Sequence, residues 1–227
     1  MKFILFLSTA LLVTNASHAA VDGEVAYIFN TFLFIFSGIL VMFMALGFAM
    51  LEAGFVRKKN TSTILLKNIA LYSIAGIMFY LVGYSLMYVD VGGYIGSLGG
   101  MFYNPTADEL ALLDGAENVD AIVETGYSAP SDWFFQMVFC ATAVSIVSGA
   151  CAERIKVWPF MIFAAVMTGL IYPIFGAWTW GGGWLAEMGF SDFAGSTIVH
   201  SVGGWAALTG CLILGARKGK YSADGKV

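Results

Sequence analysis

The sequence predicts an all-α integral membrane protein with five transmembrane helices after a signal peptide. Hydrophobic residues make up 59% of the 227 residues and charged residues only 11%, which is far more apolar than a soluble domain. The apolar residues form long runs, and each run can cross a hydrocarbon core of about 30 Å as a helix. Barrel strands would be about ten residues long and would alternate in polarity, which excludes a β-barrel.

Residues 1–19 are expected to be a cleaved signal peptide. Lys2 provides a basic start, Phe3 to Val13 an apolar core, and Ser17 and Ala19 are small residues at the positions that a signal peptidase reads. The apolar core is well short of the roughly 20 residues that a membrane span needs, which argues against an uncleaved anchor.

The remaining chain, residues 20–227, is expected to form one domain that contains the five membrane helices. The apolar segments are 28–55, 64–89, 133–152, 158–179 and 196–216. The long connection from Asp90 to Asp132 is rich in Gly and then in acidic residues. It contains no motif of a separate domain.

The basic residues predict the orientation of these helices. After the signal peptide, every Lys and Arg lies in or beside "RKKN" and Lys67, "ERIK", or "ARKGK" and the residues that follow it. By the positive-inside rule these three places face the cytoplasm, which puts the mature N-terminus outside a cell (inner) membrane. All acidic residues except Glu52, Glu153 and Asp224 then lie outside. An acidic outer vestibule would concentrate cations, although avoidance of translocated positive charge explains much of the same asymmetry.

Motifs of the common enzyme and cofactor sites are missing from the sequence. We find no Walker loop, dinucleotide-binding Gly motif, Ser-His-Asp arrangement or basic nucleic-acid patch. Cys140, Cys151 and Cys211 lie within apolar segments without C-x-x-C spacing, so we interpret them as small buried hydrophobes. We therefore expect no enzyme activity, no cofactor, no metal and no nucleic-acid partner.

The stretch "SDFAGSTIVH" carries two polar residues at the start of the fifth apolar segment. Asp192 can cap the free N–H groups of that helix. His200 lies within the segment, where burial favours a neutral imidazole that can pass a proton or bind an uncharged amine. A core histidine that bonds across helices is the alternative interpretation.

Aromatic residues mark the outer ends of the third and fourth segments. In "WFFQMVF", Phe135 and Phe139 are four residues apart and hence on one helix face. In "WTWGGGW", Trp180 directly precedes three glycines that should break the fourth helix. Aromatic faces attract cations, and Trp attracts them most strongly. The alternative is the aromatic belt that most membrane proteins carry at their interfaces.

The joint pattern of these motifs resembles the ammonium transporter (Amt/Mep/Rh) family. "DFAGSTIVH", with the Trp of "WGGG" upstream, is similar to the family signature, and "LEAGFVRKKN" and "SGACAERIK" are similar to family segments in the same order. The resemblance covers essentially the whole mature chain. It implies about eleven helices built as two inverted five-helix halves with the pore between them. This chain would then be the N-terminal half, and we expect a longer reading frame.

The resemblance also implies roles for single residues. Trp180 and Phe139 would line an outer ammonium site, with Phe135 and Phe139 as stacked gate aromatics and the Ala194 carbonyl near the cation. Asp192 would hold the loop in shape. His200 would be the first of two pore histidines, whose partner, like an outer-site serine, belongs to the half not present here.

The mechanism that the resemblance implies also follows from the energetic cost of charge in a membrane. Ammonium, or methylammonium as its analogue, would bind outside and lose its proton, and neutral ammonia would pass a His-lined apolar pore. Potassium has no proton to lose. The implied partners are membrane lipid, two further copies in a homotrimer and a cytoplasmic regulatory protein of the PII type. An ammonium-sensing receptor on the same fold and a non-conducting truncated fragment are the alternative functions.

Overall fold

The computed structural model describes residues 21–98, 107, 110–111, 114–115, 119–222 and 224–225. Within these residues, five helices are long and apolar enough to cross a membrane. They are Gly23–Phe55, Lys58–Tyr88, Ala129–Ala150, Val157–Glu187 and Ser196–Leu214. The predicted all-α class with five membrane helices is therefore confirmed. The predicted signal peptide at 1–19 lies outside the described residues.

Two spans are single α-helices, α1 (Gly23–Phe55) and α6 (Ala129–Ala150), and a short helix, α5 (Asp120–Val123), precedes α6.

The other three spans each contain one π-helical turn. The second consists of a 3₁₀ turn (Lys58–Asn60), α2 (Thr61–Met78), a π turn (Phe79–Gly83) and α3 (Tyr84–Tyr88). The fourth consists of α7 (Val157–Val166), a π turn (Met167–Ile171), α8 (Tyr172–Thr179) and α9 (Trp184–Glu187). The fifth consists of a π turn (Ser196–Ser201) and α10 (Val202–Leu214). Such π turns often lie at functional sites.

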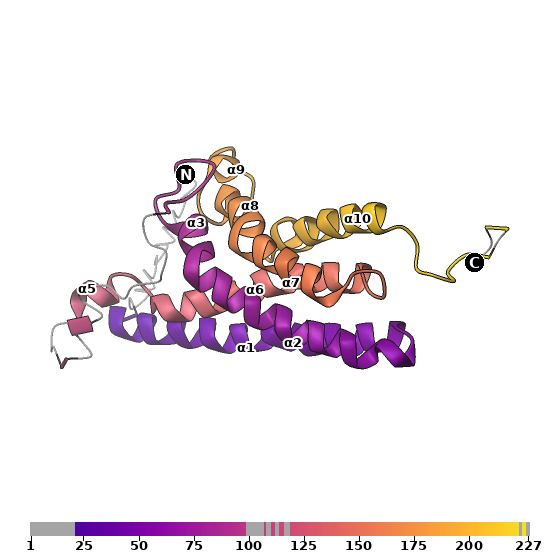
Figure 1. The fold of residues 1–227 in the computed structure, drawn as a ribbon. Coiled ribbons are helices and arrows are strands. Elements are labelled where there is room, and N and C mark those ends of the chain that lie inside the picture. Colours follow the sequence, from indigo (N-terminus) through magenta and orange to yellow (C-terminus); the bar gives the residue numbers. More distant parts are fainter. Residues whose placement is uncertain are drawn as a thin grey trace, which may run out of the picture.

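Helix α6 forms the centre of the bundle, because it packs against α1, α2 and α10 (Figure 1). Its buried face is rich in small side chains, including Ala141, Ala143 and Ser145. Small side chains let helix backbones approach closely in a membrane, where lipid provides little hydrophobic driving force between helices. The sequence of α6 therefore explains why three neighbours can surround it.

Much of α1 and α10 is exposed in this chain. Among its 33 residues, α1 buries only Gly38 and Glu52, and α10 leaves Trp205 at 68% exposure. Apolar faces of this size on membrane helices contact lipid or further protein.

The α1–α2 connection, the α6–α7 connection and the end of α10 lie at the same end of the bundle (Figure 1). These are the three places where the sequence concentrates Lys and Arg. We call this end the basic end and the opposite end the outer end.

Candidate functional site

Aromatic side chains from three helices meet at the outer end of the bundle. The ring centroids of Phe139 on α6 and Trp180, at the end of α8, are 5.7 Å apart. Phe135 lies one helical turn outward on α6, with its ring centroid 5.0 Å from that of Phe139 and 5.3 Å from that of Phe34 on α1. The planes of Phe135 and Phe139 form an angle of 82°, so these rings meet edge to face and are not stacked as the family resemblance implied.

These aromatic rings line a pocket of about 500 Å³. Its lining residues come from α1, α3, α6, the end of α8 and two connections: Phe34, Tyr84, Tyr88, Tyr127, Asp132, Phe135, Gln136, Phe139, Trp180 and Phe193. We call this the outer pocket. Its walls combine π faces with a few polar oxygens, and the lining residues that the structure describes include no Lys or Arg. Such walls suit a small cation.

Asp192 organises the loop beside this pocket. Its Oδ1 accepts bonds from the N–H groups of Gly195 (2.8 Å) and Ser196 (3.0 Å), and its Oδ2 accepts bonds from those of Thr197 and Ile198 (both 2.8 Å). The side chain is buried at 8% exposure. Burial alone would favour the neutral acid, but together the four N–H groups hold the pKa of Asp192 below its usual value. The carboxylate therefore satisfies the free donors at the start of the fifth span.

The same loop fixes the orientation of Trp180. The indole Nε1 donates to the backbone carbonyl of Asp192 at 2.6 Å. Gly195 has φ of +88°, a left-handed conformation that L side chains rarely adopt, and a Cβ there would lie 3.2 Å from the Trp180 ring. The loop thus needs a glycine next to the indole.

The other two predicted site residues are exposed in this chain. His200 lies in the π turn Ser196–Ser201, between the buried Val199 and α10, and its side chain is exposed. Ala194 is exposed in the loop before that turn. The structure thus brings Trp180, Phe139 and Phe135 together around one pocket, and it does not bring His200 into that group.

Sequence reasoning missed the polar wall of the outer pocket. Asp132 was assigned to the outer connection, but it lies in the first turn of α6 and is buried at 6% exposure. Its Oδ2 accepts from Tyr84 Oη at 2.8 Å, and its Oδ1 accepts from Gln136 Nε2 at 3.2 Å. Tyr88, one turn after Tyr84, also lines the pocket. The spacing in the sequence could have indicated that Asp132 belongs to the pocket, because positions 132, 135, 136 and 139 share one helix face.

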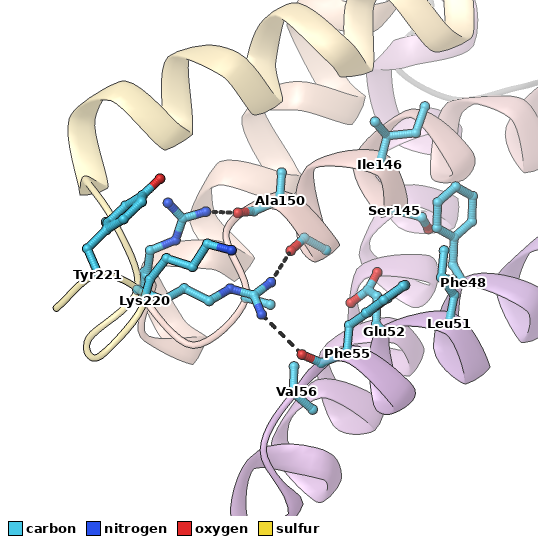
Figure 2. Close-up of a pocket in the computed structure, with 15 residues that line it drawn as sticks. Phe48, Leu51, Glu52, Phe55, Val56, Ser145, Ile146, Ala150, Lys220 and Tyr221 are labelled. Atoms are coloured by element: carbon cyan, nitrogen blue, oxygen red, sulfur yellow. Dashed lines mark hydrogen bonds between the residues drawn. The ribbon is translucent and has the colours of Figure 1, made fainter. Parts of the chain in front are cut away.

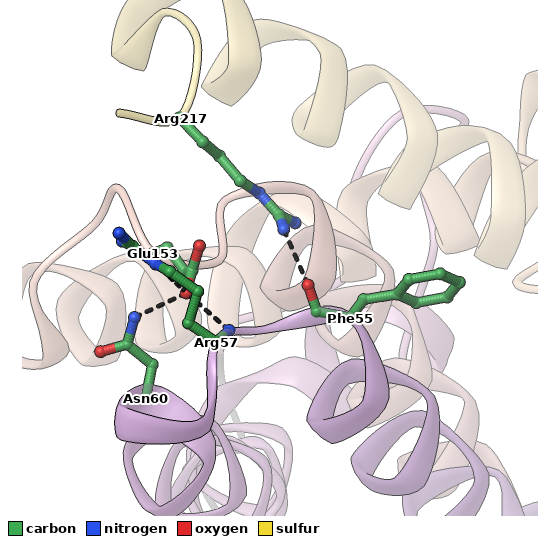
Figure 3. Close-up of polar contacts among 5 residues, drawn as sticks. All are labelled: Phe55, Arg57, Asn60, Glu153 and Arg217. Atoms are coloured by element: carbon green, nitrogen blue, oxygen red, sulfur yellow. Dashed lines mark hydrogen bonds and ion pairs between the residues drawn. The ribbon is translucent and has the colours of Figure 1, made fainter. Parts of the chain in front are cut away.

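The basic end is held together by polar bonds from long side chains. The Glu153 carboxylate accepts from Arg57 N (2.8 Å), Arg57 Nε (3.0 Å) and Asn60 Nδ2 (2.6 Å), so it joins the α6–α7 and α1–α2 connections (Figure 3). Arg217, after α10, donates to the carbonyls of Phe55 (3.1 Å) and Gly149 (3.4 Å). The N–H of Arg57 is the largest of the influences that lower the pKa of Glu153 from 4.5 to about 2.

A second pocket of about 590 Å³ lies at this end (Figure 2). Arg154 lines it and donates to the carbonyls of Ala150 and Gly215, at the ends of α6 and α10. Glu52 lines the pocket through its buried carboxylate, beside apolar side chains such as Leu51. The arginines here are engaged with helix C-termini, where positive charge is stabilising.

The chain matches the family model described as the Ammonium Transporter Family over residues 32–227. It is 41% identical to the ammonium transporter Amt2 of Archaeoglobus fulgidus, a match that covers 83% of this chain and 39% of that protein. It is 35% identical to the ammonium transporter Amt2 of Methanocaldococcus jannaschii, over 97% of this chain and 49% of that protein.

Solved structures show the same similarity. A structure described as Sensor Amt Protein superposes with a TM-score of 0.77 at 37% identity, over 90% of this chain and 49% of that chain. Mep2 of Candida albicans superposes with a TM-score of 0.69 at 27% identity, over 86% of this chain and 41% of that chain.

Fold and comparisons together define a multi-pass, all-helical membrane protein with the Amt/Mep fold. The chain belongs to the ammonium transporter family, as its motifs predicted. It spans about half the length of the curated relatives and solved structures that it matches.

Proposed function

We propose that the protein containing this chain transports ammonium across a membrane and captures the cation in the outer pocket. The observation that supports this most is the meeting of Trp180, Phe139 and Phe135 around one pocket, whose described lining contains no basic residue. π faces bind cations, and the bond from Trp180 Nε1 to the Asp192 carbonyl keeps the indole in place. Membership of the ammonium transporter family supports ammonium as the substrate.

In the proposed mechanism the cation loses its proton before it enters the membrane. Ammonium would lie against the aromatic faces, with the Ala194 carbonyl as a further acceptor. It would release a proton and leave as ammonia, because a bare charge at mid-membrane costs several kcal/mol. His200 would line the path of the neutral molecule together with residues of a second half. The proton would stay outside or travel along the imidazoles.

The orientation and assembly are part of the same proposal. The basic end would face the cytoplasm of a cell (inner) membrane, because Lys and Arg gather there. A thiol probe at Ala111 should then react with an impermeant reagent in intact cells and one at Thr61 should not, and the reverse pattern would overturn this orientation. A homotrimer, lipid contacts and a cytoplasmic regulatory protein of the PII type complete the proposal, and native mass spectrometry of the purified protein would test the trimer.

An ammonium sensor is the second candidate function. The similarity to a structure described as Sensor Amt Protein, at 37% identity, favours keeping it. A signalling domain encoded after residue 227, together with no methylammonium uptake, would select the sensor. Uptake by the complete reading frame but not by residues 1–227 alone would mean that this chain does not conduct by itself.

The main test is uptake of labelled methylammonium by the complete reading frame in cells. Trp180→Leu should raise the half-saturating concentration about tenfold, because an aliphatic side chain keeps bulk but lacks the ring quadrupole. Trp178→Leu is the matched control, because Trp178 lies on α8 but does not line the outer pocket. Unchanged affinity and selectivity in Trp180→Leu would mean that Trp180 does not bind the cation and belongs to the aromatic belt at the membrane interface.

His200→Ala tests the pore assignment in the same cells. We expect normal abundance in the membrane, because Ala is small and favours helix, together with abolished or altered transport. Reduced abundance with normal transport per molecule would make His200 a structural histidine.

A further inference from the structure

We propose that Asp132 is a cation-binding residue of the outer pocket, and that ammonium pairs with its carboxylate before it reaches Trp180 and Phe139. This inference rests on the proposed transport of ammonium, and it adds a charged binding station to the aromatic site. It is carried by the position of Asp132, by its hydrogen-bond partners and by the charges of the residues around the pocket.

Asp132 is the outermost of four side chains that line the outer pocket along one face of α6. Phe135 and Gln136 lie one turn deeper and Phe139 lies two turns deeper, and all four residues line the outer pocket. At about 1.5 Å per residue, Asp132 is roughly 10 Å further out than Phe139 along the helix. A cation that enters from outside therefore meets the carboxylate first and the Trp180 side of the pocket afterwards.

The carboxylate has acceptor capacity left for a ligand. Two ionised oxygens offer about four lone-pair sites, and the bonds from Tyr84 and Gln136 occupy two of them. The amide of Gln136 donates to Asp132 through Nε2, and its buried Oε1 finds no hydrogen-bond partner among the residues that the structure describes. The buried hydroxyl of Tyr88 also lacks a partner within the described ranges. Ammonium carries four N–H donors, which matches these free acceptors.

Charge gives a second, independent argument. Among the described residues that line the outer pocket, Asp132 is the one that carries a charge, and it is only 6% exposed. Its hydrogen-bond donors Tyr84 and Gln136 are neutral, so within the part of the lining that the structure describes no cation compensates its charge. An ionised group without a counter-ion is costly to bury, and a bound cation removes that cost. At the basic end, by contrast, Glu153 is paired with Arg57.

A purely structural role makes a different prediction. The Tyr84 bond links α3 to α6, and Asp132 could serve only as this brace. A brace needs a hydrogen-bond acceptor but no negative charge, so Asp132→Asn would leave ammonium affinity unchanged. Tyr84→Phe removes the link and keeps the charge.

The experiment measures ammonium-dependent current and methylammonium uptake in the complete reading frame, at low and high ionic strength. Asp132→Asn should raise the half-saturating ammonium concentration about tenfold and should weaken its dependence on salt, because a charge interaction near the entrance is lost. Asp132→Glu should stay within about threefold of the wild type, because it keeps the charge. Glu124→Gln is the control for charge on the outer side, because Glu124 is exposed and does not line the pocket.

The half-saturating concentration does not depend on the number of transporters, so a reduced abundance of Asp132→Asn would not spoil the test. If Asp132→Asn keeps the wild-type half-saturation and salt dependence while Trp180→Leu is impaired, transport stands and this inference is wrong. If Tyr84→Phe reproduces the whole effect of Asp132→Asn, Asp132 is a brace. If the wild type shows no saturable uptake, the proposed function itself fails.

Discussion

The two ends of the bundle use carboxylates to hold their loops, but they neutralise them differently. At the outer end, the Asp192 carboxylate accepts hydrogen bonds from four backbone N–H groups. The Asp132 carboxylate accepts hydrogen bonds from the Tyr84 hydroxyl and the Gln136 amide. At the basic end, Glu153 binds Arg57, and Arg217 donates to two helix-terminal carbonyls. In the described part of the chain, Asp132 and Asp192 therefore accept from neutral donors, whereas Glu153 is paired with a cation.

This difference decides whether the negative charge of a carboxylate can still attract a cation from solution. Backbone N–H groups stabilise a carboxylate without cancelling its field at longer range, while a guanidinium in direct contact does both. In the proposed function the outer end can consequently attract a cation, whereas at the basic end Glu153 is paired with Arg57, and Arg154 and Arg217 donate to helix-terminal carbonyls. The polar bonds of the basic end serve stability, and we expect its variants to affect folding more than ammonium affinity.

The largest effect should come from Asp192. Asp192→Ala leaves four N–H groups without an acceptor and should cost about 3–5 kcal/mol of unfolding free energy, seen as low abundance and early thermal unfolding in detergent. Asp192→Asn should recover only part, because its single amide oxygen can replace one of two accepting oxygens. Normal abundance of Asp192→Ala would mean that water replaces the carboxylate and that the outer loop is not held as described.

A somewhat smaller effect should come from a buried cluster of hydrogen-bonded polar side chains near the basic end. Glu52 accepts from Asn68 (3.1 Å) and Ser148 (2.8 Å). Lys67 donates to the Ser148 carbonyl (3.3 Å) and lies 4.1 Å from the centroid of the Phe160 ring. Lys67 and Glu52 are only 2% and 3% exposed.

Lys67→Met should lower the unfolding free energy by about 3 kcal/mol, because the Glu52 charge would lose its nearby cation. The double variant Lys67→Met with Glu52→Gln should lose less than the sum of the single changes, since it removes both charges. Thermal unfolding of the three variants in the same detergent measures this coupling. Additive losses would show that the two charges do not interact.

The smallest effect should come from Glu153. Glu153→Gln keeps one accepting oxygen and loses the charge, which should cost about 1–2 kcal/mol. Because the pKa of Glu153 is lowered from 4.5 to about 2, its contribution is present above pH 4.5 and is lost as the pH falls toward 2. The stability difference between the wild type and Glu153→Gln should therefore shrink in acid. A difference that is constant from pH 7 to pH 3 would contradict the ion pair.

The sequence by itself determined the membrane spans, the concentration of basic residues in three connections and the one-face spacing of Phe135 and Phe139. These features are readable because a chain in lipid must satisfy its backbone hydrogen bonds within each helix, so length and hydropathy decide the element. Motif similarity determined the family, although it did not predict that the rings of Phe135 and Phe139 meet edge to face.

The family resemblance implied that Trp180, Phe139 and Phe135 share an outer site, and only the tertiary structure decided which other residues line the outer pocket. Trp180 meets Phe139 because α8 ends beside α6, and no local pattern in the sequence encodes that contact. From the sequence, Asp132 was assigned to a loop, because hydropathy cannot distinguish the buried first turn of a helix from an exposed connection. Its burial follows from α3, which places the Tyr84 hydroxyl against it, and such a contact depends on how helices pack and not on the composition of either one.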